Sequence, residues 1–199
     1  MDKQNNNMID LGQIRENLSY YSPLIQAREI PGTQITDAAI LAFVYYKQKR
    51  LCVLLNKRSL LVEHHKGEIS FPGGVKDYTD KSILYTALRE AEEEMGIKPA
   101  DVEIVTQLSS VITQTNFLIT PFVGIIPQSY PFKINKDEID QILEVPLDDM
   151  IKQFQQQTGS ANLLNSANSF HYTYENHIIW GATANILSEL LFAISKYKI

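Results

Sequence analysis

The most informative segment of the sequence begins as Gly73-Gly-Val-Lys-Asp-Tyr-Thr-Asp80 and ends as Arg89-Glu-Ala-Glu-Glu-Glu-Met-Gly-Ile97. The two glycines indicate a turn. Residues 82–95 contain neither Gly nor Pro, which predicts a helix, and Gly96 stands where a helix C-cap belongs. The segment therefore predicts a loop followed by a helix that ends at Gly96.

Three glutamates of this helix, Glu90, Glu93 and Glu94, stand at positions i, i+3 and i+4, so their carboxylates project from one face. Like charges at these spacings each cost an isolated helix roughly 0.2–0.5 kcal/mol. A divalent cation would reverse the sign of this energy, because hard ions such as Mg²⁺ bind carboxylate oxygens and bridge to substrate phosphates. The spacing predicts a metal site, and a solvated acidic face stays open as the alternative.

The frame Arg-Glu-x-x-Glu-Glu-x-Gly weighs against a merely solvated face. Five specified residues in such a frame arise by chance in a chain of this size with a probability on the order of 10⁻⁴. The stretch resembles the Nudix box, which reads G-x5-E-x7-R-E-U-x-E-E-x-G-U, where U is aliphatic. The residues from Arg89 to Ile97 fall in place, with Ala91 at the first aliphatic position.

One departure from the box indicates a branch of this family. Fourteen residues separate Gly74 from Arg89, one more than the usual box has, and the pair Asp77 and Asp80 replaces the early Glu. This spacing is similar to that of the coenzyme A pyrophosphatase branch, which has G-G-x-x-D-x-x-D.

The stretch before the glycines resembles the second signature of that branch, L-L-T-x-R-S-x3-R-x3-G-x3-F-P-G-G. The matching residues are Leu54, Leu55, Arg58, Ser59, Gly67, Phe71, Pro72, Gly73 and Gly74. Two positions depart from it: Asn56 replaces Thr, and Glu63 stands where the branch has Arg. The second change removes a cation that could contact phosphate.

The resemblance covers roughly residues 36–195 and implies an α/β (α+β) Nudix fold. Such a fold has a mixed β-sheet sandwiched between helices and carries the Nudix loop-helix-loop. We expect residues 36–199 to form this domain. Residues 1–35 would be an N-terminal extension with a short helix, at residues 9–18, that packs on the domain.

The resemblance also implies Mg²⁺ or Mn²⁺ as the cofactor, with Glu90, Glu93 and Glu94 as ligands and a further oxygen from the Gly74 carbonyl. Arg89 would orient Glu93 through a charge-assisted hydrogen bond at i+4, which makes both residues part of the predicted catalytic set.

Glu138, in the acidic segment of residues 135–140, is the candidate general base. The alternative is an ordinary acidic residue at the start of a helix. The expected substrate-binding residues are Arg58, His65, Gly73 and Gly74, and of these Arg58 and His65 would meet substrate phosphates by family position. For Arg58, an ordinary charge at the end of a strand is the alternative.

Elsewhere the pattern predicts a hairpin of strands at residues 38–46 and 51–55, and two further strands at 102–110 and 118–126. Pro121 indicates an edge strand or a strand start, because proline cannot donate to a ladder. A helix is expected from Leu147, and the centre of the polar segment 153–169 is expected to be an exposed loop. A strand at 170–174 and an apolar C-terminal helix would complete the domain.

The composition limits the classes of partner. With 199 residues, 44% hydrophobic and 21% charged, the chain is long enough for one globular domain. Its net charge of −5 gives no general attraction to nucleic acid or to an anionic membrane. The lone Cys52 excludes an internal disulfide, and no run reaches the ~20 apolar residues that span a bilayer. We expect a cytoplasmic enzyme with a small-molecule substrate, and a homodimer is left open.

The expected reaction is metal-dependent hydrolysis of a pyrophosphate bond. By resemblance the substrate is coenzyme A or a thioester of it, which would give 3′,5′-ADP and (acyl-)4′-phosphopantetheine. Hydrolysis of ADP-ribose, NADH or (deoxy)nucleoside triphosphates is one alternative. The other is a catalytically silent Nudix module that binds a nucleotide or a protein partner.

Overall fold

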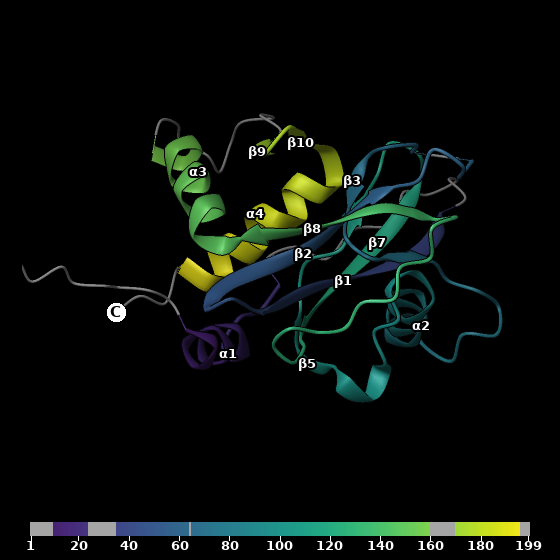
Figure 1. Cartoon of the computed structure of the whole chain (residues 1–199), viewed down its shortest axis with the longest axis horizontal. Coiled ribbons are helices and arrows are strands. Elements are labelled where there is room, and N and C mark those ends of the chain that lie inside the picture. Colours follow the sequence, from purple (N-terminus) through teal and green to yellow (C-terminus); the bar gives the residue numbers. More distant parts are fainter. Residues whose placement is uncertain (1–9, 24–34, 64, 160–169, 196–199) are drawn as a thin grey trace, which may run out of the picture.

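A mixed β-sheet with helices on both faces forms the centre of the computed structural model (Figure 1). The structure describes residues 10–23, 35–63, 65–159 and 170–195. The described α-helices are α1 (Leu11–Ser19), α2 (Ile83–Met95), α3 (Leu147–Gly159) and α4 (Gly181–Ser195). The fold is α/β, as the sequence predicts. Residues 1–9 and 24–34 of the expected N-terminal extension lie outside the described residues.

Eight strands make up the large sheet. They are β1 (Thr36–Lys47), β2 (Arg50–Arg58), β3 (Ile69–Ser70), β4 (Gly73–Val75), β5 (Glu103–Gln107), β6 (Val111–Ile112), β7 (Phe117–Ile125) and β8 (Ile139–Pro146). The main path runs β3-β2-β1-β7-β5, while β4 pairs with β1, β6 with β7 and β8 with β2. Two short strands, β9 (Tyr172–Tyr174) and β10 (His177–Ile179), form a separate hairpin.

Strand β1 is the centre of the sheet. It runs parallel to β7 from Thr36 to Val44 and antiparallel to β2 near its end, where Lys47 lies opposite Arg50. Near its start it pairs with β4, so that Ala39 lies opposite Gly74. The predicted hairpin of β1 and β2 is confirmed. Through its pairing with β4, the same strand also fixes Gly73 and Gly74 within the sheet.

Two hydrophobic cores lie on opposite faces of the sheet, because alternate residues of a strand point to opposite sides. Leu41, Phe43 and Tyr45 of β1 pack in the core that includes Ala87, Ala91 and Met95 of α2. Ala42 and Val44 of the same strand pack in the second core, to which α1, α3 and α4 contribute. A strand that is buried on both faces reads as a continuous apolar run, as residues 38–46 do.

Helix α2 begins and ends where its sequence predicts. The Ser82 side chain accepts a hydrogen bond from the backbone N–H of Tyr85, which caps the first turn. Gly96 has a φ of 69°, and its N–H bonds to the Glu92 carbonyl at 2.8 Å. This left-handed conformation suits glycine because an L side chain there would be strained.

The glycine pair does not form the expected turn. Gly73 and Gly74 belong to β4 and lie opposite Ile40 and Ala39. A Cβ on Gly73, whose φ is 148°, would lie 2.2 Å from the Ala39 carbonyl oxygen. Glycine is therefore required here for a close approach of two backbones, which the sequence cannot distinguish from a turn.

The prediction that Pro121 marks an edge or a strand start is wrong. Pro121 lies inside β7, which pairs with β1 on one side and with β5 and β6 on the other. The Pro121 carbonyl accepts from Leu108 N at 2.9 Å, so its donor-less nitrogen faces the same side, at the break between β5 and β6. The proline is tolerated because the ladder is already interrupted there.

Two further differences concern the C-terminal half. The sequence does not predict strand β8. Its burial pattern is mixed, with Asp140 and Gln141 both exposed, so apolar and polar residues do not alternate regularly along it. Helix α3 continues to Gly159, so the start of the polar segment 153–169 is helical, and the loop expected at its centre stays a prediction. Residues 160–169 lie outside the described residues. The expected strand at 170–174 and the C-terminal helix are present as β9 and α4.

Helix α1 packs at the end of the molecule away from α2 (Figure 1). Its Ile14 and Leu18 are fully buried, and Asn17 donates a hydrogen bond to the Ile194 carbonyl of α4 at 2.8 Å. Arg15 forms an ion pair with Glu103 of β5 at 2.7 Å. Among the helices that the structure describes, none is long and apolar enough to cross a membrane.

Candidate active site

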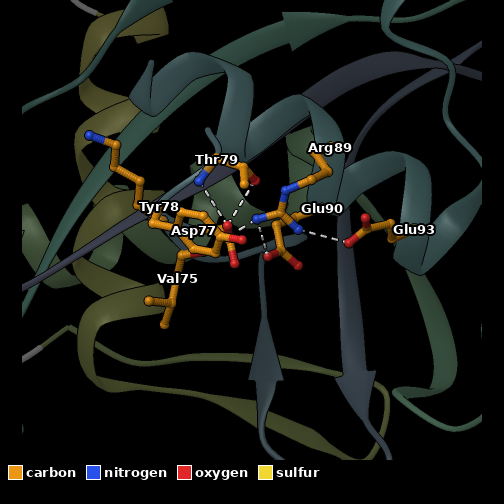
Figure 2. Close-up of a pocket in the computed structure, with 8 residues that line it drawn as sticks. Val75, Asp77, Tyr78, Thr79, Arg89, Glu90 and Glu93 are labelled. Carbon is orange, nitrogen blue, oxygen red and sulfur yellow. Dashed lines mark hydrogen bonds and ion pairs between the residues drawn. The ribbon is translucent and has the colours of Figure 1, made fainter. Parts of the chain in front are cut away.

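A pocket of about 510 Å³ opens between β4, the loop that follows it, and α2 (Figure 2). Its lining residues are Val75, Lys76, Asp77, Tyr78, Thr79, Arg89, Glu90 and Glu93. Tyr78 is 96% exposed and stands on the loop tip. The pocket lies between the two ends of the segment 73–97, so three of the predicted site residues, Arg89, Glu90 and Glu93, lie together.

Arg89 is fixed by a two-point ion pair with Asp80. Its Nε and Nη2 donate to the two Asp80 carboxylate oxygens, each at 3.0 Å. The Asp80 side chain is only 1% exposed and also accepts from Thr86 Oγ1 at 2.9 Å and from Asp77 N at 2.9 Å. The Arg89 hydrogen bonds hold the pKa of Asp80 well below its usual range. Asp80 is therefore the anchor of Arg89.

The same guanidinium reaches two of the predicted metal ligands (Figure 2). Arg89 Nη1 donates to Glu93 Oε2 at 2.8 Å, and Nη2 lies 2.9 Å from Glu90 Oε1. Nη2 also contacts the Val75 carbonyl oxygen at 3.3 Å. The contact at i+4 agrees with the expected orienting role for Glu93, while the contacts to Asp80 and Glu90 were not foreseen.

The loop between β4 and α2 is held by its own side chains. Asp77 Oδ1 accepts from the backbone N and from Oγ1 of Thr79, both at 2.8 Å, and these bonds lower the pKa of Asp77. Together with the bond from Asp77 N to Asp80, they form a tight turn at residues 77–80. The loop is thus pinned to α2 through Asp80 and Arg89.

Glu90 lies directly against the glycine stretch. A Cβ on Gly74 would fall 2.5 Å from the Glu90 carboxyl carbon, so the carboxylate fills the space that a side chain on Gly74 would need. Burial raises the pKa of Glu90, and the Arg89 charge opposes this rise. The contact brings one predicted ligand beside the backbone that carries another, the Gly74 carbonyl.

Glu94 is the most deeply buried of the three glutamates, at 2% exposed. Its Oε2 accepts from Gly73 N at 3.1 Å and from Asn56 Nδ2 at 3.4 Å. Burial raises the pKa of Glu94 to about 8, and the Gly73 hydrogen bond works against that rise. Glu93 differs from it, because its side chain is 54% exposed.

Glu138 lies in the turn before β8, not at the start of a helix. Its Oε1 accepts from Asn135 Nδ2 at 3.0 Å, and Asn135 N in turn donates to the Glu94 carbonyl at 2.9 Å. The charge of Glu138 adds to the burial that raises the pKa of both Glu90 and Glu94. This late turn therefore faces the same acidic site.

Arg58 lies close to the buried glutamate of this site, whereas His65 does not line the pocket. Arg58, at the end of β2, is close enough for its charge to lower the pKa of Glu94, against the larger effect of burial. Its Nε is buried and has no hydrogen-bond partner within the described part of the chain. His65 is half-exposed, bonds to Glu68 at 3.1 Å and does not line the pocket.

The oxygen donors suit a hard divalent cation, although they are not yet gathered around one point. Among the described residues, no three His, Cys, Asp or Glu side chains are placed to hold a metal ion together. The carboxylates of Glu90 and Glu93 contact the Arg89 guanidinium instead. Glu90 and Glu94 nevertheless both lie against β4, at Gly74 and at Gly73, and carboxylates are ligands that Mg²⁺ and Mn²⁺ prefer.

Two buried polar residues of the site have no role assigned from the sequence. Asp80 stands out there only as half of an acidic pair, and its partner Arg89 comes later in the chain. Asn56 stands out as a departure from a signature, but its contact with Glu94 joins β2 to α2 across the fold. Such contacts between distant segments leave no local pattern in the sequence.

Comparisons with known proteins indicate the family of this chain. A model of the NUDIX domain matches residues 36–166. Two proteins named uncharacterized Nudix hydrolase NudL, from Salmonella paratyphi B and Salmonella newport, are each 39% identical over 148 residues, which covers 71% of this chain and 74% of theirs. The solved structure of a MutT/nudix family protein from Enterococcus faecalis has a TM-score of 0.51 at 13% identity, covering 92% of this chain and 74% of that one.

The solved structure bears on the fold alone, whereas the domain match and the Salmonella relatives bear on the family. Nudix hydrolases act on nucleotide-linked small molecules and typically use divalent metals. The loop and helix that carry Arg89, Glu90, Glu93 and Glu94 lie within the matched residues. This chain belongs to the Nudix hydrolase family and is a pyrophosphohydrolase.

Proposed function

We propose that this pyrophosphohydrolase splits coenzyme A, or a thioester of it, into 3′,5′-ADP and (acyl-)4′-phosphopantetheine with the help of Mg²⁺ or Mn²⁺. One water molecule is consumed, the P–O–P bridge breaks, and each product keeps one of the two phosphates. The observation that carries the proposal is the convergence of Glu90 and Glu94 on the glycine pair that ends the signature similar to the coenzyme A branch.

The position of that signature in the fold supports the proposal. Leu54 and Leu55 are fully buried in β2 and hold this strand in the two cores. The strand ends at Arg58, whose charge acts on Glu94, and the signature ends at Gly73 and Gly74 in β4. Both ends of the signature therefore reach the acidic site. The Arg58 side chain is partly exposed, and its guanidinium is a suitable donor for a substrate phosphate.

The roles follow from what each side chain touches. Glu90, Glu93, Glu94 and the Gly74 carbonyl would hold the cation, which supplies charge neutralisation for the two phosphates. Arg89, anchored by Asp80, positions Glu90 and Glu93. Glu138, whose charge reaches Glu90 and Glu94, would accept the proton of the attacking water. His65 bonds to Glu68 and does not line the pocket, so its expected contact with a substrate phosphate rests on family position alone.

A substrate panel tests the proposal. Purified protein with Mg²⁺ or Mn²⁺ would be incubated with coenzyme A, acetyl-coenzyme A, ADP-ribose, NADH and a deoxynucleoside triphosphate in ¹⁸O-labelled water. We expect 3′,5′-ADP and 4′-phosphopantetheine from coenzyme A, and mass spectrometry of the products shows which phosphorus was attacked. If coenzyme A stays intact while ADP-ribose or a nucleotide is cleaved, the proposed substrate is wrong.

A matched pair of variants tests the role of the glutamates. We expect Glu94→Gln to lower turnover at least about 100-fold, because it removes a charged ligand from a buried site. Glu92→Gln makes the same change at an exposed position of α2 and should leave turnover unchanged. Equal effects of both changes would contradict the site, and no turnover by the unaltered protein on any substrate would favour a silent binding module.

A further inference from the structure

Asn56 is a fully buried polar residue beside the site, at the end of the apolar run of β2. Its neighbours in the sheet are Ser70 of β3 and Ile142 of β8. A buried amide is costly unless both of its ends find partners. Asn56 finds them: Ser70 Oγ donates to Oδ1 at 2.6 Å, and Nδ2 donates to Glu94 Oε2 at 3.4 Å.

The direction of these hydrogen bonds is set by Glu94. Oε2 of Glu94 accepts from Gly73 N, and a carboxylate that binds a cation is ionised and only accepts, so the amide turns its NH₂ group toward Glu94 and its oxygen toward Ser70. The Ser70 hydroxyl then has to donate, as it does at 2.6 Å. Ser70 and Asn56 therefore form a chain of donors that ends on a single oxygen of the Glu94 side chain.

The two oxygens of Glu94 consequently differ. Oε2 accepts from both Asn56 and Gly73, whereas no hydrogen bond to Oε1 is found within the residues that the structure describes. A carboxylate that is held by one oxygen keeps the other available for a cation. The 3.4 Å contact is long, so its contribution lies in fixing the orientation of the carboxylate more than in the strength of the bond.

We propose that Asn56, oriented by Ser70, is a positioning residue that presents Glu94 Oε1 to the divalent cation. This inference rests on the metal site of the proposed function and is independent of the substrate. It also gives a role to one of the two positions at which this chain departs from the signature similar to the coenzyme A branch. The side chain of Asn reaches one bond further than that of Thr, which suits it to the contact with Glu94.

The test measures Mn²⁺ binding to the free protein by electron paramagnetic resonance, without substrate. Asn56→Leu, which keeps the shape but removes the donor, should weaken Mn²⁺ binding about 10-fold or more. The matched control is Asn17→Leu, which makes the same change at a buried asparagine of α1. It should leave Mn²⁺ binding unchanged. Thermal unfolding without metal confirms that each variant is folded.

A double-mutant cycle separates positioning from general damage. Ser70→Ala should weaken Mn²⁺ binding by a few-fold when Asn56 is present and should have no effect in the Asn56→Leu background, because Ser70 acts through Asn56. Equal effects of Ser70→Ala in both backgrounds would overturn the inference, as would unchanged Mn²⁺ binding in Asn56→Leu. If that variant binds Mn²⁺ normally while the unaltered protein cleaves coenzyme A, the inference fails and the proposed function stands. If Mn²⁺ binding weakens in that variant but the unaltered protein does not cleave coenzyme A, the positioning role of Asn56 stands and the proposed substrate is wrong.

Discussion

At the scale of single residues, the two neighbouring glycines of β4 have different tasks. A Cβ on Gly73 would collide with the Ala39 carbonyl oxygen, which belongs to a backbone that cannot move aside. A Cβ on Gly74 would meet the end of the Glu90 side chain, which can rotate away. The absence of a side chain at Gly73 is therefore required by the fold, and its absence at Gly74 leaves room for a predicted ligand, Glu90.

This difference predicts opposite results for the two alanine substitutions. Gly73→Ala should lower the free energy of unfolding by about 1–3 kcal/mol, because backbone strain is added in the sheet. Gly74→Ala should leave that free energy within about 0.5 kcal/mol of the original but reduce turnover about 10-fold or more, since Glu90 is displaced. Urea unfolding and steady-state kinetics measure the two effects. A loss of stability in Gly74→Ala with normal turnover would contradict the assignment.

Asp80 gives a prediction for acid stability. Its folded-state pKa lies below the unfolded value of about 3.9, so its contribution is fully present above that value and is lost as pH falls through the folded pKa. Asp80→Asn should therefore be less stable than the original protein from pH 7 to about pH 5, and the gap should narrow below about pH 4. Urea unfolding across this range measures the gap. A gap that is constant down to pH 3 would show that the Asp80 charge is not the cause.

At the scale of elements, the C-terminus of α2 connects the glutamates to the turn that carries Glu138. Lys133 N donates to the Met95 carbonyl at 2.8 Å, and Asn135 N donates to the Glu94 carbonyl at 2.9 Å. The last carbonyls of the helix are thus satisfied by a distant segment, not by water. The end of the helix and the candidate base therefore move together.

A substitution at the C-cap should disturb both. Gly96→Ala places a Cβ in the left-handed region, 2.8 Å from Lys133 Cβ, and should lower the free energy of unfolding by about 1–2 kcal/mol. Because the Lys133 segment shifts, turnover should also fall. Ser82→Ala, at the other end of α2, should cost about 1 kcal/mol of stability and leave turnover unchanged. Thermal unfolding and kinetics of the pair would show whether the coupling is confined to the C-terminal end.

At the scale of the whole molecule, one hydrophobic core lies apart from the candidate active site. The core formed with α1, α3 and α4 lies on the face of the sheet opposite α2. Figure 1 shows α1 at the far end from α2. A change in that core should act on stability without acting on chemistry.

Ile14→Ala tests this separation. Ile14 is fully buried in α1, so the substitution should lower the free energy of unfolding by about 2–5 kcal/mol. Turnover at saturating substrate should stay unchanged below the unfolding transition. A fall in turnover of the folded variant would show that α1 influences the site.

The sequence predicts an element of the fold when the residues that determine it lie close to it in the chain. Helix α2 with its Ser82 and Gly96 caps is predictable, because each signal lies within a few residues of the element that it ends. Strand β8 is not, because its polar residues are tolerated only through pairing with β2. The three glutamates are recognised from their spacing on one helix. Asp80 as the anchor of Arg89 depends on a contact across a folded loop, and Asn56 depends on one between β2 and α2.

The ladder between β4 and β1 is only three residue pairs long, whereas β1 and β7 are paired over nine. Short ladders open at a lower free energy than the global transition. In native-state hydrogen exchange, the amides of residues 73–75 should therefore exchange well before those of the centre of β1. In mild denaturant the enzyme should lose activity while its circular dichroism is still that of the folded protein, so inactivation would report a local opening and not unfolding.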